Sequence, residues 1–86
     1  MKLPVEPERL RRLFPSLADE DLEAYSEVTR SLLAQPAARG RRLAEVMAAA
    51  HRGREKEAGG QPLEDDERRA VAYVRALGKM QGRAGQ

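Results

Sequence analysis

Three closely spaced arginines are the residues of this chain best suited to bind a ligand. Arg39, Arg41 and Arg42 follow Pro36, where the sequence predicts that a helix begins. Guanidinium groups bind phosphate and carboxylate through paired hydrogen bonds. A helix start carries the positive end of the macrodipole, so folding alone does not favour cations there. The cluster is therefore a candidate contact for phosphate, RNA, DNA or an acidic partner, although Glu45 is expected to neutralise part of it.

The same charges also have an internal explanation. Residues 34–56 hold six cations and two acids, whereas residues 16–33 hold five acids and one cation. If the helices predicted over these segments lie together, their rims attract each other without any ligand. Arginine makes up 13 of the 16 cations, and isoleucine and asparagine are absent, as in proteins from GC-rich genomes. The abundance of arginine alone therefore does not indicate a function.

His51 and Glu55 are the residues that could begin a metal site. Their spacing places both on one helical face, but a metal site requires three or four ligands and nothing else nominates the others. We therefore predict that His51 is a half-buried residue at the edge of an apolar face. The acidic clusters at 19–21 and 64–67 lack the alternating ligand spacing of a calcium loop and are assigned to helix starts. No metal or cofactor is expected.

The sequence shows no pattern typical of an enzyme. Its few hydroxyl residues do not occur in a Gly-x-Ser-x-Gly motif, the glycines form no phosphate-binding loop, and there is no cysteine. We therefore expect a non-catalytic protein without a small-molecule substrate.

The residue usage and periodicity predict an all-α fold. β-branched residues are scarce, while alanine, leucine, arginine and glutamate, which favour helices, are abundant. We expect a small helical bundle with three longer helices and a short N-terminal helix. The predicted ranges are about 7–14, 18–34, 36 or 40 to 57, and 64–80.

Apolar side chains recur at helical spacing in each longer segment and predict the buried faces. Small residues beside the third stripe predict close packing of neighbouring helices. The predicted buried residues are Leu22, Tyr25, Val28, Thr29, Leu32 and Leu33; Leu43, Val46, Met47 and Ala50, flanked by Ala44, Ala48 and Ala49; and Ala70, Val71, Val74, Leu77 and Gly78.

The length allows one domain at most, which we place at residues 1–81, with a frayed tail at 82–86. Apolar residues form 41% of the 86-residue chain, but 14 of them are alanine. Because such a core is sparse, some apolar surface is expected to be covered by a second copy. The first residues lack the apolar region of a signal peptide, and the longest apolar run, residues 46–50, is far below the ~20 residues of a membrane span. A soluble, cytoplasmic protein without membrane contact is expected.

The function expected from these features is interaction with another protein or self-association. The alternative is a nucleic-acid-binding or regulatory protein that uses Arg39, Arg41 and Arg42, with the third helix as the recognition helix of a helix-turn-helix. A net charge of only +2 and the lack of asparagine in that helix count against this alternative. The third hypothesis is a metal-dependent activity around His51 and Glu55.

Overall fold

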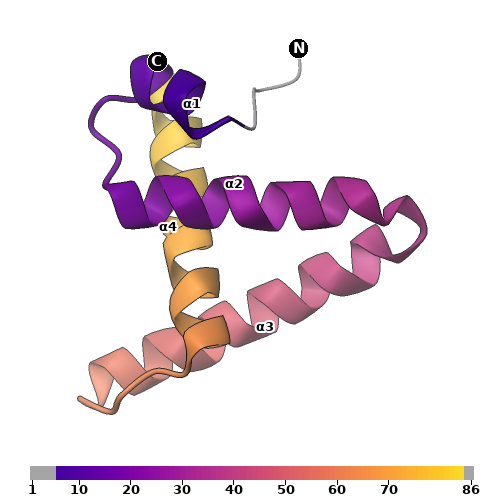
Figure 1. Cartoon of the computed structure of the whole chain (residues 1–86). Coiled ribbons are helices and arrows are strands. Elements are labelled where there is room, and N and C mark those ends of the chain that lie inside the picture. Colours follow the sequence, from indigo (N-terminus) through magenta and orange to yellow (C-terminus); the bar gives the residue numbers. More distant parts are fainter. Residues whose placement is uncertain (1–5, 85–86) are drawn as a thin grey trace.

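The computed structural model describes residues 6–84, and the side chains of residues 6–81. Within this range helices joined by short loops are the regular structure and there is no strand, which confirms the predicted all-α fold (Figure 1). A short helix comes first and three longer helices follow, as predicted. The elements are α1 (Pro7–Leu13), α2 (Asp19–Ala34), the 3₁₀ turn η1 (Pro36–Ala38), α3 (Arg39–Ala58) and α4 (Asp65–Ala84).

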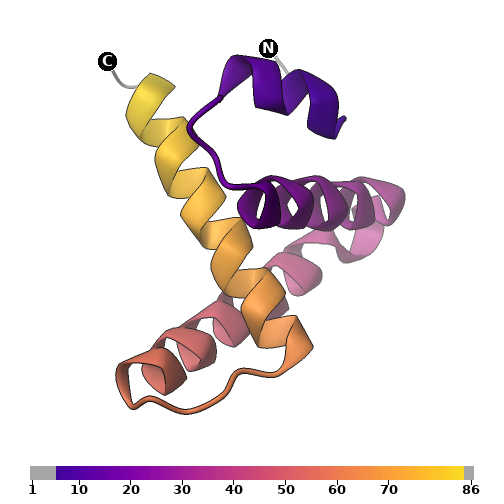
Figure 2. The same ribbon diagram turned by 60° about the vertical axis from the view of Figure 1, so that its left-hand side comes forward.

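The helices are arranged around α4, which crosses both α2 and α3 (Figures 1 and 2). α2 and α3 diverge from η1 in a V and make few contacts with each other, while each packs extensively on α4. α1 packs on α2 and contributes Leu10 to the same buried cluster as Met80 of α4. The fold therefore depends on α4 as the common packing partner.

Local sequence explains where the helices begin and end. Pro7 occupies the first turn of α1, where its missing N–H costs no hydrogen bond. α2 and α4 each begin with three consecutive acidic residues that complement the macrodipole. α3 ends at Ala58 with Gly59 as its C-cap, and Gly60 then adopts a positive φ of 71°, which glycine tolerates without strain.

The main buried cluster lies where α2 meets α4. The rings of Tyr25 and Tyr73 stack there, with centroids 5.9 Å apart and planes inclined by 14°. Burial, with a smaller effect of Tyr25, raises the pKa of the Tyr73 phenol above its ordinary value. The buried members of this cluster are Leu10, Leu17, Leu22, Ala24, Tyr25, Val28, Leu32, Ala72, Tyr73, Ala76 and Met80.

A second cluster, of Ala49, Ala50 and Ala70, lies where α3 meets α4. The two helices pack closely at Gly53, where an added Cβ would lie only 2.7 Å from Cγ2 of Val71. The predicted close packing through small residues is thus confirmed at Ala49. It is wrong for Ala44 and Ala48, which are exposed.

Three residues predicted to be buried are exposed instead. Leu33 is 49% exposed and Met47 is 40% exposed, and Gly78 is also exposed. Leu33 and Met47 each follow a residue of the packed face, and one residue is a turn of about 100° around a helix. That rotation takes both side chains off the face that meets α4.

The C-terminal helix is longer than predicted, since α4 continues past Met80 to Ala84. Of the predicted tail, residues 85 and 86 lie outside the described residues. No helix in the described part of the chain combines the length and apolar character that crossing a bilayer requires.

Candidate functional site

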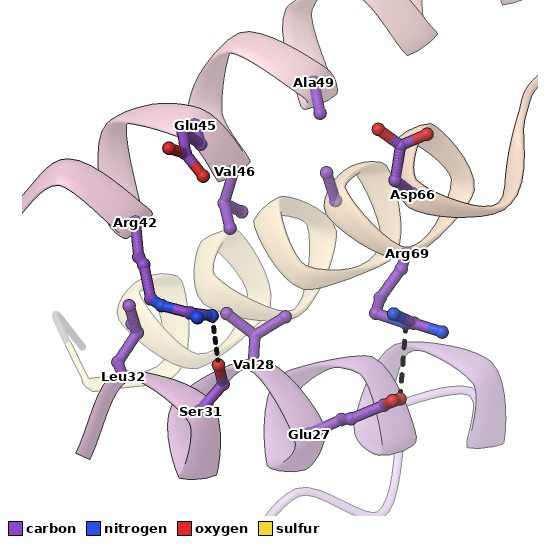
Figure 3. A pocket seen from close by; sticks show the side chains of 11 residues that line it. Glu27, Val28, Ser31, Leu32, Arg42, Glu45, Val46, Ala49, Asp66 and Arg69 are labelled. Carbon is purple, nitrogen blue, oxygen red and sulfur yellow. Dashed lines mark hydrogen bonds and ion pairs between the residues drawn. The ribbon is translucent and has the colours of Figure 1, made fainter. Parts of the chain in front are cut away.

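The three longer helices enclose an open groove of about 320 Å³ inside the V (Figure 3). Its floor is apolar because it continues the apolar faces of α2 and α3 that pack on α4. Its rim carries charged side chains. The floor is formed by Val28, Leu32, Val46, Ala49 and Ala70, and the rim by Glu27, Ser31, Arg42, Glu45, Asp66 and Arg69. An apolar floor with a polar rim is the composition of a site that buries part of a partner.

Hydrogen bonds and ion pairs join the rim across the helices. Arg42 of α3 donates from Nε to Oε1 of Gln35 at 2.8 Å and from Nη1 to Oγ of Ser31 at 3.0 Å. Nε of Arg69 on α4 lies 3.3 Å from Oε2 of Glu27 on α2. The contacts of Arg42 with Ser31 and of Arg69 with Glu27 are visible in Figure 3. The two cations of the rim are therefore already engaged within the chain.

Glu45 is the rim carboxylate that lacks a partner in the described part of the protein. It accepts no hydrogen bond there and forms no ion pair, and the expected pairing with Arg41 does not occur. Asp66, by contrast, lies 3.8 Å from Nη2 of Arg52. Two rim charges, those of Arg42 and Glu45, thus have no ion-pair partner in the described structure. Arg42 is held by hydrogen bonds to neutral side chains, whereas the Glu45 carboxylate has no partner there and lies beside the apolar floor.

The structure does not bring the three candidate arginines together. Arg42 is bound to α2, while Arg39 and Arg41 are exposed and have no hydrogen-bond or ion-pair partner among residues 6–81. Residues two apart on a helix do not face each other, so Arg39 and Arg41 point to nearly opposite sides of α3. All three lie in the first turn of α3, which contains no acidic residue.

The prediction that the acidic rim of α2 pairs with the basic rim of α3 is wrong, because the two helices form no ion pair with each other in the described structure. The α3 arginine that reaches α2 binds two uncharged side chains, those of Ser31 and Gln35. Of the acidic residues of α2, Asp21 and Glu27 pair with cations of α4, and Asp19 pairs with Arg11 of α1. α4 supplies the compensating charge because it, rather than α3, packs along α2.

Asp21 forms a buried charge contact between α2 and α4. Its side chain is fully buried, and Oδ1 accepts a hydrogen bond from Nη1 of Arg75 at 3.0 Å. Oδ2 accepts no hydrogen bond and lies 3.7 Å from Nζ of Lys79. Arg75 and Lys79 are four residues apart, so one face of α4 presents both cations to the carboxylate.

Glu67 forms the corresponding contact between α3 and α4. Its side chain is 3% exposed, and Oε1 accepts hydrogen bonds from Nζ of Lys56 at 2.7 Å and from the backbone N–H of Glu64 at 3.0 Å. Oε2 lies 3.4 Å from Nε of Arg52. The bond from Lys56, followed by the Glu64 amide, lowers the pKa of the Glu67 carboxyl, and the same bond raises the pKa of Lys56.

The prediction that both acidic clusters serve as helix starts is incomplete, because it does not include these two contacts. Asp21 and Glu67 are each the third residue of a helix, so they do lie in the first turn. Each faces an Arg-x-x-x-Lys pair on another helix, at Arg75 and Lys79 or at Arg52 and Lys56. That repeated spacing is the sequence signal that could have suggested them.

Within the described residues, no further ligand joins His51 and Glu55 to complete a metal site. Nε2 of His51 lies 3.1 Å from Oε1 of Glu55, but His51 is 77% exposed, so the predicted half-buried position is wrong. Carboxylates of Glu64, Asp66 and Glu67 do lie within 4.8 Å of one another. Two of them are already paired with cations of the chain, Asp66 with Arg52 and Glu67 with both Arg52 and Lys56.

Comparisons with known proteins give no family assignment. No protein-family model matches the chain. Among curated proteins and among solved structures, no similar protein is found either. The candidate site therefore has to be judged by its own geometry and charge.

Proposed function

We propose that this is a non-catalytic interaction domain that binds an apolar segment of another protein in the groove between α2, α3 and α4. The observation that carries the proposal is the apolar floor of Val28, Val46 and Ala49, left open beside the unpaired carboxylate of Glu45. A partner side chain entering the groove gains about 25 cal/mol per Å² of apolar surface removed from water. A nearby cation on that partner would gain the charge contact with Glu45.

Site-specific cross-linking tests this proposal. Because the chain has no cysteine, Glu45→Cys introduces a single thiol at the rim of the groove. A photoreactive maleimide on this thiol is expected to cross-link specific proteins in a lysate of the source cells. The same reagent without illumination should leave these proteins unlinked.

Arg54→Cys provides the matched control. Arg54 is exposed, has no partner in the described structure, and lies nine residues from position 45, half a turn around α3. The proposal predicts adducts that form from Glu45→Cys and are absent or several-fold weaker from Arg54→Cys. Equal adduct patterns from the two variants would contradict it.

Nucleic-acid binding is the second candidate, supported by the two unpaired arginines Arg39 and Arg41. Such binding would be weak and strongly dependent on salt, because few phosphates would be contacted. Fluorescence anisotropy with mixed DNA and RNA at low salt tests it. Arg39→Ala and Arg41→Ala should each weaken binding, whereas Arg12→Ala, which removes an unpaired arginine of α1, should not. Absence of binding at low salt would eliminate this candidate.

The cytoplasm is the proposed location for either activity. A chain without cysteine gains nothing from an oxidising compartment, where disulfides would form.

A further inference from the structure

The side of α2 that faces away from the groove carries an apolar side chain next to a free cation. Leu33 is the most exposed large apolar residue of the described structure, at 49%. Arg30, three residues earlier, is exposed and has no hydrogen-bond or ion-pair partner within that structure. Residues three apart on a helix are neighbours. Leu33 and Arg30 therefore form one surface, which we call the Leu33 face.

The Leu33 face is complementary to the groove in both polarity and charge. The groove offers an apolar floor and the unpaired carboxylate of Glu45. The Leu33 face offers an aliphatic side chain and an unpaired guanidinium. Joining the two surfaces would cover exposed Leu33 and pair Glu45 with Arg30, and each of these side chains lacks a partner within one copy.

We infer that the groove of one copy of this chain binds the Leu33 face of a second copy, with Leu33 on the apolar floor and Arg30 beside Glu45. This inference rests on the proposed function and names the partner of the same groove. A single copy cannot make the contact, because Ser31 at the groove rim and Leu33 are two residues apart and point to opposite sides of α2.

The two surfaces differ, so the contact is head-to-tail. After two copies pair, one keeps a free groove and the other keeps a free Leu33 face, and such contacts generate rings or open chains rather than a closed two-fold dimer. The average mass of the assemblies should therefore rise continuously with protein concentration. The sparse, alanine-rich core is consistent with apolar surface that is covered only on association.

The other exposed apolar residues fit the groove less well. In the described structure no unpaired cation lies three or four residues from Met47, since Arg41 and Arg54 are six and seven residues away. Leu13 lies at the end of a seven-residue helix, and Arg9, the cation four residues before it, is already paired with Glu6. Arg12 is unpaired in the described structure, but as the adjacent residue it points about 100° away around the helix. Among the exposed large apolar residues of the described structure, only Leu33 has an unpaired cation three or four residues away on the same helix.

Exchanging the charges of Glu45 and Arg30 tests whether the groove of one copy binds the Leu33 face of another. Sedimentation of the purified full-length protein should give an average mass that rises above 9.6 kDa with concentration. Glu45→Arg and Arg30→Glu should each weaken association about fivefold or more, since each juxtaposes like charges. A mixture of these two variants, and the Glu45→Arg/Arg30→Glu double variant, should both regain association, because each restores an opposite-charge pair.

Leu33→Ser tests the apolar part of the contact and should weaken association tenfold or more. Met47→Ser is the matched control and should leave association unchanged. The inference is overturned if the mass stays at 9.6 kDa at all concentrations, or if neither the mixture nor the double variant recovers association. If self-association is absent but groove-specific cross-links to other proteins persist, the choice of partner is wrong and the proposed function stands. If both are absent, both are wrong.

Discussion

Glu67 contacts three groups at once, and its charge should therefore control the response of the protein to acid. Its lowered pKa means that the folded state holds the ionised form more strongly than the unfolded chain does. The resulting stabilisation is complete above the ordinary glutamate pKa of about 4.3 and is lost as the pH falls below it. The raised pKa of Lys56 means that this residue stabilises the folded protein fully below the ordinary lysine pKa of about 10.4. This stabilisation is lost as the pH rises above that value.

Glu67→Gln should lower stability at neutral pH, because the amide keeps an acceptor for the Glu64 N–H but loses the charge contacts with Lys56 and Arg52. The decline of stability between about pH 5 and pH 3 should also become shallower. Urea unfolding at several pH values measures both effects. Glu57→Gln, at an exposed glutamate without an ion pair in the described structure, should preserve the wild-type slope. Equal slopes for Glu67→Gln and the wild type would contradict the assignment.

Replacing Gly53 by alanine would have two opposing effects on stability, one from helix propensity and one from packing. Alanine is favoured over glycine in a helix by about 1 kcal/mol. At this position, however, a Cβ would lie 2.7 Å from Val71, whose branched side chain is stiff, and 3.2 Å from the backbone oxygen of Glu67. Gly53→Ala should therefore destabilise the protein by about 1–3 kcal/mol through overpacking between α3 and α4.

Gly78→Ala is the matched control, because nothing lies within 4 Å of a Cβ added there. It should stabilise the protein by about 0.5–1 kcal/mol. Thermal and urea unfolding would measure the two variants side by side. A Gly53→Ala protein as stable as the wild type would show that α3 and α4 separate readily.

At the scale of elements, the contact of Asp21 with Arg75 and Lys79 fixes the crossing of α2 and α4. Removing one cation leaves the other near the buried carboxylate, so Arg75→Ala should cost about 1–3 kcal/mol. Removing both leaves an uncompensated buried charge, and the double variant should cost about 3–5 kcal/mol. Urea unfolding of both variants gives these free energies.

Arg68→Ala removes an exposed α4 arginine that has no partner in the described structure, and its effect should stay within about 0.5 kcal/mol. Equal losses from Arg68→Ala and Arg75→Ala would show that the Asp21 contact contributes little.

At the scale of the whole molecule, local patterns predicted the helices but not their pairing. The acidic starts and the apolar spacing located α2 and α4, because these signals act within one helix. Leu32 and Leu33 could not be distinguished, since only the position of α4 determines which of two adjacent leucines is covered. The contact of Asp21 likewise depends on α4, where its partner Arg75 lies 54 residues later in the chain.

The position of the candidate site also depends on how the helices pair, which local sequence patterns do not predict. The sequence drew attention to Arg39, Arg41 and Arg42, because their position at a helix start is locally unfavourable. The groove arises instead from the V between α2 and α3, and the direction of each helix is set by its contact with α4. Of the three arginines, only Arg42 lines this groove.

This dependence on α4 leads to a prediction about hydrogen exchange. α2 and α3 pack on α4 and make few contacts with each other, so opening of α4 should release both. The amides of residues 70–76, which contact both buried clusters, should exchange most slowly and only through global unfolding. α1, with Leu10 as its buried residue, should exchange fastest among the helices. NMR-detected exchange measures these rates, and retained protection in α2 or α3 after α4 has exchanged would show that those two helices are stable without it.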